Sequence, residues 1–148
     1  MMIKNVMLID DNKIDLFVNQ RIIEKYNPEI GIKTFNNAMS AISFFKLLEH
    51  KINIKPLTVP DVVLLDINMP EMNGFNFFEE FNNLNLSDKG NIDIYMLSSS
   101  LCPDDIYRAR TEPNCSGYIT KPLTGHKLEN VFNKSLNNME CEKFKKII

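Results

Sequence analysis

The stretch VVLLDINMPEMNG, residues 62–74, decides the fold of this 148-residue chain. It begins with four consecutive apolar residues and places a carboxylate, Asp66, directly after them. A short continuous apolar run is typical of a strand that is buried on both faces of a sheet. Asn68, Pro70 and Gly74 follow, and these residue types form turns. The stretch therefore predicts a central strand that presents Asp66 at an edge of the sheet, with the chain turning away after it.

Strand-like and helix-like segments alternate along the rest of the chain. Apolar segments that indicate strands occur at residues 3–9, 30–35, 92–98 and 117–120. Each is followed by a segment with helical spacing, such as Ile14, Phe17, Val18 and Ile22 in the first unit. The fourth helix, near residues 104–110, is the least periodic. Because each parallel connection carries a helix back across the sheet, this pattern predicts an α/β fold with a doubly wound parallel sheet in three layers.

Composition limits the number of domains and the classes of partner. A chain that is 44% hydrophobic has enough apolar residues for one globular core, which we expect to span residues 1–138. Residues 139–148 are expected to form a tail or an extension of the last helix. Residues 50–60 are expected to form a long surface loop. We expect no output domain. The net charge of −2 lacks the basic excess that binding to a phosphate backbone needs, so we expect no direct nucleic acid partner.

Cysteine usage and hydropathy indicate a cytoplasmic protein. Cys102, Cys115 and Cys141 are odd in number and share no metal-ligand spacing, as expected of reduced thiols. No apolar run reaches the roughly 18 residues that a membrane span requires. The first apolar run ends in two acids and does not resemble an export signal. We therefore expect no membrane insertion.

Polar side chains follow four of the expected strands. Asp10 and Asp11 follow the first strand, Asp66 the third, Ser98 ends the fourth and Lys121 follows the fifth. The carboxyl ends of parallel strands meet at one edge, where open α/β sheets bind ligands. Three crowded carboxylates are costly unless a hard divalent cation such as Mg²⁺ lies among them. A lysine and a hydroxyl can then bind anionic oxygens, so the set predicts phosphoryl transfer onto Asp66.

Four motifs in this order resemble the receiver domains of two-component response regulators, in particular the single-domain CheY-like members. They are LIDDN at residues 8–12, LLDINMPEMNG at 64–74, YMLSSS at 95–100 and YITKP at 118–122. Each motif lies at a strand end, and together they cover most of the chain. The resemblance implies a flavodoxin-like (βα)5 fold with five parallel strands in the order 2-1-3-4-5, an order for which CheY is a standard example. It also implies that residues 1–138 form the receiver domain.

The resemblance implies a phosphoacceptor and a metal site. Asp66 matches the aspartate that accepts a phosphoryl group from a sensor histidine kinase or a histidine phosphotransfer protein. Asp11 matches the direct ligand of Mg²⁺, with Mn²⁺ as an alternative ion, and Asp10 matches the acid that acts through water. Asn68 matches the position whose backbone carbonyl completes the metal site. Function would be signalling rather than turnover of a separate substrate, with self-catalysed phosphorylation and autodephosphorylation.

The resemblance also implies a switch. Lys121 matches the lysine that contacts Asp66 and then the phosphoryl group, and a cis peptide bond joins it to Pro122. Ser98 and Tyr118 match the hydroxyl and aromatic positions of the switch, with Tyr118 moving inward after phosphorylation. The surface formed by the fourth helix, fifth strand and fifth helix would then bind a downstream protein, or the phosphoryl group would pass onward in a relay.

Several alternatives remain open at the level of sequence. Asp10 and Asp11 are also suited to capping the first helix, and Asp66 to capping the turn before the third helix. Tyr118 is also suited to a place in the core. As a whole, the site also resembles an aspartyl-phosphate phosphatase of the haloacid dehalogenase type, although that class carries its nucleophile after the first strand. The last alternative is a receiver-like adaptor that is not phosphorylated.

Overall fold

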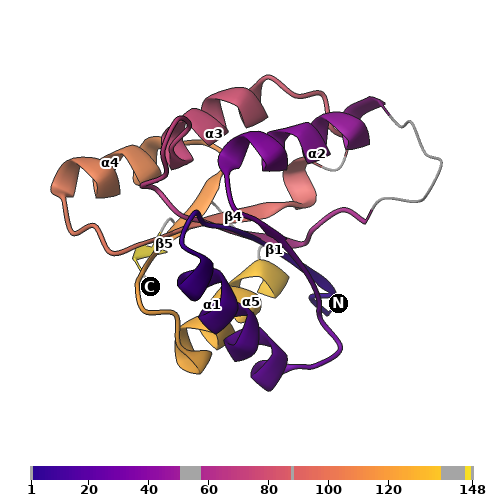
Figure 1. Cartoon of the computed structure of the whole chain (residues 1–148), viewed down its shortest axis with the longest axis vertical. Coiled ribbons are helices and arrows are strands. Elements are labelled where there is room, and N and C mark those ends of the chain that lie inside the picture. The colour runs from indigo at the N-terminus through magenta and orange to yellow at the C-terminus, as the bar shows by residue number, and fades with distance from the viewer. Residues whose placement is uncertain (1, 51–57, 88, 138–145, 148) are drawn as a thin grey trace.

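The computed structural model describes residues 2–50, 58–87, 89–137 and 146–147. The elements, in chain order, are β1 (Asn5–Ile9), α1 (Lys13–Tyr26), β2 (Gly31–Phe35), α2 (Ala38–His50), β3 (Val62–Leu65), α3 (Gly74–Asn82), the 3-10 helix η1 (Lys89–Asn91), β4 (Asp93–Ser98), α4 (Pro103–Thr111), β5 (Cys115–Thr120), α5 (Gly125–Asn137) and β6 (Lys146–Ile147). Helices α2, α3 and α4 cover one face of the sheet, and α1 and α5 cover the other (Figure 1). The predicted three-layer α/β arrangement is confirmed.

All strand pairs in the sheet are parallel, and the strand order is β2-β1-β3-β4-β5-β6. The predicted order 2-1-3-4-5 is therefore confirmed, with β3 at the centre. The expected five strands are joined by a sixth, which the sequence analysis did not predict. Strand β6 pairs with the outer edge of β5, where Lys146 lies opposite Gly117 and Ile147 opposite Tyr118. Residues 146 and 147 are therefore not a continuation of α5, and residues 138–145 lie outside the described part of the chain.

The core consists of two apolar layers, one on each face of the sheet. In β3, Val63 and Leu65 pack toward α2 and α3, whereas Val62 and Leu64 pack into the layer that α1 and α5 cover. All four side chains are at most 2% exposed. This is the burial that the continuous apolar run predicted, because both faces of the central strand are covered.

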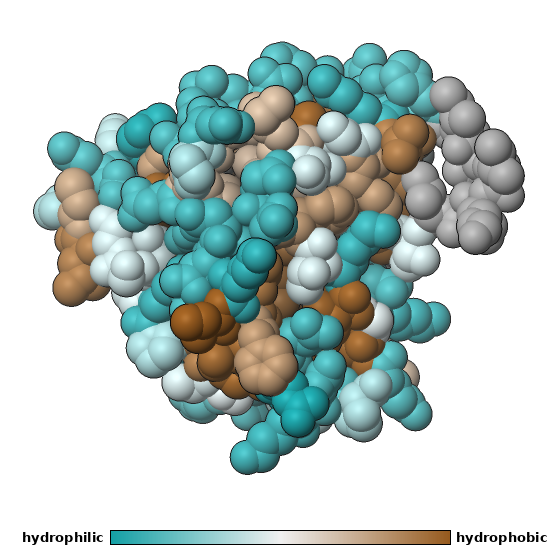
Figure 2. Space-filling view, in the orientation of Figure 1, coloured by the Kyte–Doolittle hydropathy of each residue, from teal (hydrophilic) through white to brown (hydrophobic). Residues whose placement is uncertain are grey.

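Helix α1 forms where the apolar spacing predicted it, but the spacing did not locate its buried side. Ile14 and Phe17 are 73% and 64% exposed, and Val18 is also exposed, whereas Ile23 is fully buried. Figure 2 shows hydrophobic side chains gathered over α1 on the surface of the molecule. We call Ile14, Phe17 and Val18 the α1 patch.

No helix in the described part of the chain is long and apolar enough to cross a membrane. Cys102 is exposed and Cys115 is buried, and both are reduced cysteines that form no disulfide bond. Cys141 lies outside the described residues, as does most of the long loop expected at residues 50–60.

Gly74 lets α3 begin against the backbone of the central strand. A Cβ atom at this position would lie 2.7 Å from the carbonyl oxygen of Asp66 and 3.2 Å from the side chain of Met96. Gly125 is likewise the first residue of its helix, α5, but a Cβ atom at this position would have no heavy atom within 4 Å. The two glycines therefore form a matched pair at the first positions of two helices.

We predict that Gly74→Ala lowers the free energy of unfolding by about 1–3 kcal/mol, because the backbone must shift to admit the methyl group. Gly125→Ala should cause no loss, since alanine favours the helix and the space is open. Urea unfolding of both variants and the parent protein measures the difference. Equal stability of the two variants would contradict the close approach of α3 to Asp66.

Candidate functional site

The sheet brings the predicted polar residues to one edge. Asp10 follows β1 and Asp66 follows β3, and the amide of Asp66 donates to the carbonyl of Ile9 at 2.9 Å. Ser98 ends β4, and its carbonyl accepts from the amide of Lys121, just after β5, at 2.9 Å. The residues follow adjacent strands, so sheet hydrogen bonds fix their spacing. Positions far apart in the sequence are thus held on one rigid frame.

Three carboxylates meet at this edge. Asp10, Asp11 and Asp66 each offer an oxygen, and these atoms lie within 4.8 Å of one another. Asp10 and Asp66 are 3% and 7% exposed, whereas Asp11 is exposed. Burial, with the negative charge of Asp10, raises the pKa of Asp66 from 3.8 to about 6, although Lys121 acts in the opposite direction. Oxygen donors that repel one another and lack enough positive charge fit a hard divalent cation.

Lys121 supplies the positive charge of the site. Its Nζ lies 2.9 Å from an oxygen of Asp10, 3.0 Å from Asp15 and 3.5 Å from Asp66. Burial acts to lower the pKa of Lys121, but the hydrogen bonds to Asp10 and Asp15 and the charge of Asp66 outweigh it, so the pKa is raised and the ammonium stays charged. Asp15 is a partner of Lys121 that the sequence motifs did not identify. A clue was available, since Asp15 lies in the first turn of the helix that follows the acidic pair.

Asparagine, not aspartate, caps the helices beside the site. Asn12 caps α1, where its side chain accepts from the amides of Ile14 and Asp15. Asn73 caps α3 and forms a reciprocal capping box with Asn76. The alternative roles of Asp10, Asp11 and Asp66 as caps of these helices are therefore wrong. The carboxylates lie at the sheet edge, where Asp10 accepts from the amide of Asn12 and from the ammonium of Lys121, each at 2.9 Å.

Ser98 begins a chain of hydrogen bonds through the loop before α4. The amide of Ser100 donates to the Ser98 hydroxyl oxygen at 3.1 Å, and the Ser100 hydroxyl donates to Asp105 at 2.6 Å. The Tyr118 hydroxyl donates to the Ser100 carbonyl at 2.7 Å. Burial raises the pKa of Tyr118, so its hydroxyl remains a donor. Cys102 joins the loop by donating its amide to the Ser100 hydroxyl.

Tyr118 lies inside the core. Its side chain is only 2% exposed, and it packs in the core layer that faces α2, α3 and α4. The inward movement of Tyr118 after phosphorylation stays a prediction.

The remaining predicted positions form the turn after β3 and the bend after β5. The amide of Gly74 donates to the carbonyl of Ile67 at 2.8 Å and closes the turn that contains Pro70. Asn68 is exposed within this turn, and the role of its backbone carbonyl stays a prediction. The bond between Lys121 and Pro122 is cis, the isomer that the resemblance implied.

Comparison with known proteins shows the family. The chain matches the response regulator receiver domain model over residues 6–133. A two-component response regulator from Cytophaga hutchinsonii is 32% identical, with a TM-score of 0.80 over 93% of this chain and 99% of that one. A response regulator receiver protein from Dyadobacter fermentans is 28% identical, with a TM-score of 0.73 over 90% of this chain and 98% of that one. This chain therefore belongs to the response regulator receiver domain family.

The curated relatives are much longer proteins. The chain is 30% identical over 131 residues to the sensor histidine kinase CheAY of Helicobacter pylori, which covers 88% of this chain and 15% of that protein. The chain spans between 6% and 17% of the curated relatives that it matches. The likeness concerns the receiver family, a class of signalling phosphoacceptors, and it does not favour either a phosphatase of the haloacid dehalogenase type or an unphosphorylated adaptor.

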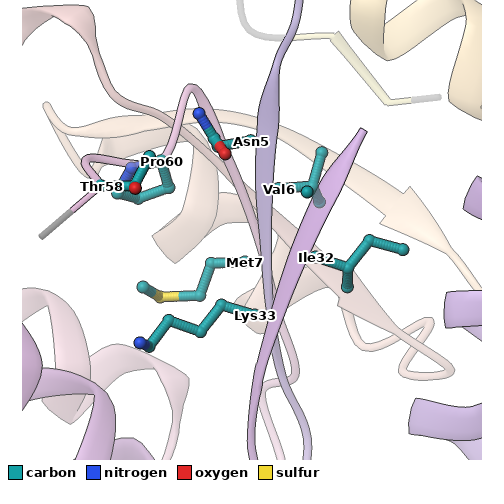
Figure 3. Close-up of a pocket in the computed structure, with 8 residues that line it drawn as sticks. Asn5, Val6, Met7, Ile32, Lys33, Thr58 and Pro60 are labelled. Atoms are coloured by element: carbon teal, nitrogen blue, oxygen red, sulfur yellow. The ribbon is translucent and has the colours of Figure 1, made fainter. Parts of the chain in front are cut away.

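A cavity of about 300 Å³ lies away from this edge, near the amino ends of β1 and β2 (Figure 3). Asn5, Met7, Lys33, Thr58 and Pro60 are among its lining residues. None of the acidic residues or Lys121 lines it. The cavity is therefore separate from the candidate site.

We predict that Asp66→Asn stabilises the metal-free protein at neutral pH. A carboxyl whose pKa rises from 3.8 to about 6 on folding opposes folding once it must ionise, so wild-type stability falls as pH rises through this window. Above pH 6, the free energy of unfolding of Asp66→Asn should exceed that of the wild-type protein by about 3 kcal/mol, and below pH 3.8 this difference should disappear. Unfolding with urea in the presence of a chelator, at a series of pH values, measures it. Equal stability of the wild-type protein and Asp66→Asn above pH 6 would contradict the raised pKa of Asp66.

Proposed function

We propose that this receiver accepts a phosphoryl group on Asp66 from a phosphohistidine of a sensor kinase or a phosphotransfer protein, in a Mg²⁺-dependent reaction. The observation that carries this proposal is the buried Asp66 carboxylate, which clusters with Asp10 and Asp11 and lies 3.5 Å from the Lys121 ammonium. A nucleophile, a cation site and a fixed positive charge are the parts that phosphoryl transfer needs.

In the transfer step, an oxygen of Asp66 forms a bond to phosphorus while the bond between phosphorus and the histidine nitrogen breaks. The electron pair of the broken bond leaves with the imidazole, which takes up a proton. Asp11 and Asp66 would hold Mg²⁺ directly, Asp10 through water and Asn68 through its backbone carbonyl. The bound ion, with Mn²⁺ as a substitute, supplies neutralisation of the phosphoryl oxygens. Hydrolysis of the aspartyl phosphate by water would reset the protein.

Lys121 and Ser98 are placed to bind the phosphoryl oxygens. The lysine is held at the edge by the backbone bond to Ser98 and carries a charge that its carboxylate neighbours maintain. Ser98 is fully buried and lies at the end of β4, beside the strand that carries Asp66. A fixed ammonium and a fixed hydroxyl stabilise the charge that spreads over the oxygens in the transition state.

The loop before α4 transmits the signal in this proposal. Movement of Ser98 toward the phosphoryl group would shift Ser100, which holds both Tyr118 and Asp105. Because Asp105 lies in the first turn of α4, the helix would shift relative to β5. The downstream partner would recognise the surface of α4, β5 and α5, unless the phosphoryl group passes onward in a relay. Strand β6 lies along the outer edge of β5 and is part of this surface.

The α1 patch is the proposed contact surface for the phosphohistidine donor. Helix α1 begins just after the acidic pair, so a protein that delivers a phosphoryl group to Asp66 must lie close to its first turns. Ile14 and Phe17 are the most exposed members of the patch and offer apolar area to such a partner.

We predict that Phe17→Ser slows phosphoryl transfer from a phosphorylated histidine phosphotransfer protein by about fivefold to tenfold, because an apolar anchor of the interface is lost. Labelling by phosphoramidate, which needs no protein interface, should be unchanged. Leu47→Ser on α2 is the matched control, since Leu47 is also an exposed apolar residue. Equal loss with both donors, or an equal effect of Leu47→Ser, would contradict donor docking on α1.

The direct test of the proposed function uses phosphoramidate and Mg²⁺. Intact mass spectrometry should show the addition of one phosphoryl group that survives acid and is lost in base, as expected of an acyl phosphate. Labelling should disappear when Mg²⁺ is chelated and in Asp66→Asn, which folds at least as well as the parent protein by the argument given above. Unlabelled wild-type protein, or equal labelling of Asp66→Asn, would overturn the proposal. Mass is the suitable readout because the chain contains no tryptophan.

A further inference from the structure

Asp15 contacts the lysine of the site without belonging to the metal cluster. Its carboxylate accepts a hydrogen bond from Lys121 at 3.0 Å. Among the described residues, the oxygens that group within 4.8 Å come from Asp10, Asp11 and Asp66 only. Asp15 is therefore a carboxylate partner of Lys121 that a bound cation would not engage.

The fold aims Asp15 at Lys121. Asn12 caps α1 and accepts from the amide of Asp15 at 3.1 Å, which fixes the first turn of the helix. The Asp15 side chain is 40% exposed, whereas the side chain of Lys121 is 18% exposed, so the pair lies at the rim of the site. An acid in the first turn is also favoured by the helix dipole. The backbone of Asp15 is thus held in place independently of Lys121, and its carboxylate lies within hydrogen-bond reach of the ammonium.

Asp15 competes with Asp66 for the ammonium. Lys121 makes hydrogen bonds to Asp10 and Asp15, at 2.9 and 3.0 Å, and only a longer ion pair with Asp66, at 3.5 Å. An ammonium has three N–H donors in a compact arrangement, so two are already directed away from Asp66. Lys121 must give up part of this arrangement when it turns to an oxygen of a phosphoryl group on Asp66.

We propose that Asp15 is a positioning residue that holds Lys121 away from Asp66 and so slows phosphoryl uptake. This inference rests on the proposed function, since it assigns regulation to the same lysine. Asp10 would share its negative charge with a cation held at Asp10, Asp11 and Asp66, and its hydrogen bond to Lys121 would then be weaker. The hydrogen bond between Lys121 and Asp15 remains until transfer, when Lys121 exchanges it for a bond to a phosphoryl oxygen. Once the phosphoryl group is in place, Asp15 has no bond to Lys121 to lose.

The effect should therefore be confined to uptake. Phosphorylation begins with Lys121 bound to Asp15 and ends with it bound to the phosphoryl group. Hydrolysis begins and passes its transition state with Lys121 on the phosphoryl group. Removing the Asp15 charge therefore changes the free energy of the starting state of phosphorylation. It changes neither the starting state nor the transition state of hydrolysis.

The test compares Asp15→Asn with wild type in labelling by phosphoramidate and Mg²⁺, followed by intact mass. We expect uptake about fivefold faster, the size expected for the loss of one partly exposed ion pair. The rate of phosphoryl loss after donor removal should stay within about twofold, as should the Mg²⁺ concentration for half-maximal labelling, since Asp15 is outside the cluster. Asp15→Glu should restore slow uptake, because it keeps a carboxylate at the rim.

Asp104→Asn is the matched control. Asp104 also lies in the first turn of a helix at this edge of the sheet and is exposed, so its removal repeats the loss of one negative charge and of a helix-dipole interaction. If Asp15→Asn takes up phosphate no faster than Asp104→Asn, or if uptake and loss change by equal factors, the inference is overturned. Wild-type protein that fails to label would instead overturn the proposed function.

Discussion

The crowding of three carboxylates around one ammonium is the constraint on which the site depends. Asp10 and Asp66 are buried, and together with Asp11 they place more negative charge at the sheet edge than Lys121 can balance. Burial first, and then the charge of Asp10, raises the pKa of Asp66 to about 6, so its ionised form is costly in the folded protein. A rigid sheet cannot spread the carboxylates apart, so the imbalance is relieved only by positive charge brought from outside or by a proton. This supports the proposed divalent cation at the site.

The local sequence keeps these acids free for that role. Asn12 and Asn73 take the capping positions of α1 and α3, so Asp10 and Asp66 are not used to satisfy helix amides. Gly74 allows α3 to start close to the Asp66 backbone without a steric conflict. Neutral asparagine side chains cap the two helices, and the charged aspartate side chains lie at the sheet edge. This division lets a buried acidic site form without weakening the helices that surround it.

Much of this arrangement could be predicted from the sequence, because it depends on short patterns. The continuous apolar run of β3 and the regular alternation predicted the parallel sheet and its carboxyl edge, whereas the strand order was implied by the resemblance to receiver domains. The spacing in α1 predicted a helix but not which of its sides is buried, because periodicity does not say which neighbouring element covers which side. The exposure of Phe17 could not be predicted for that reason. The contact between Asp15 and Lys121 joins residues 106 positions apart. Strand β6 has only two residues, too few to carry a pattern.

The most direct measurement of the central claim is the chemical identification of the phosphorylated residue. Phosphorylated protein is reduced with borohydride, which converts an aspartyl phosphate to homoserine, then digested and sequenced by tandem mass spectrometry. The account predicts homoserine at position 66 and at no other position, dependent on both phosphodonor and Mg²⁺. Homoserine at Asp10, Asp11 or Asp15, or none at all, would contradict it.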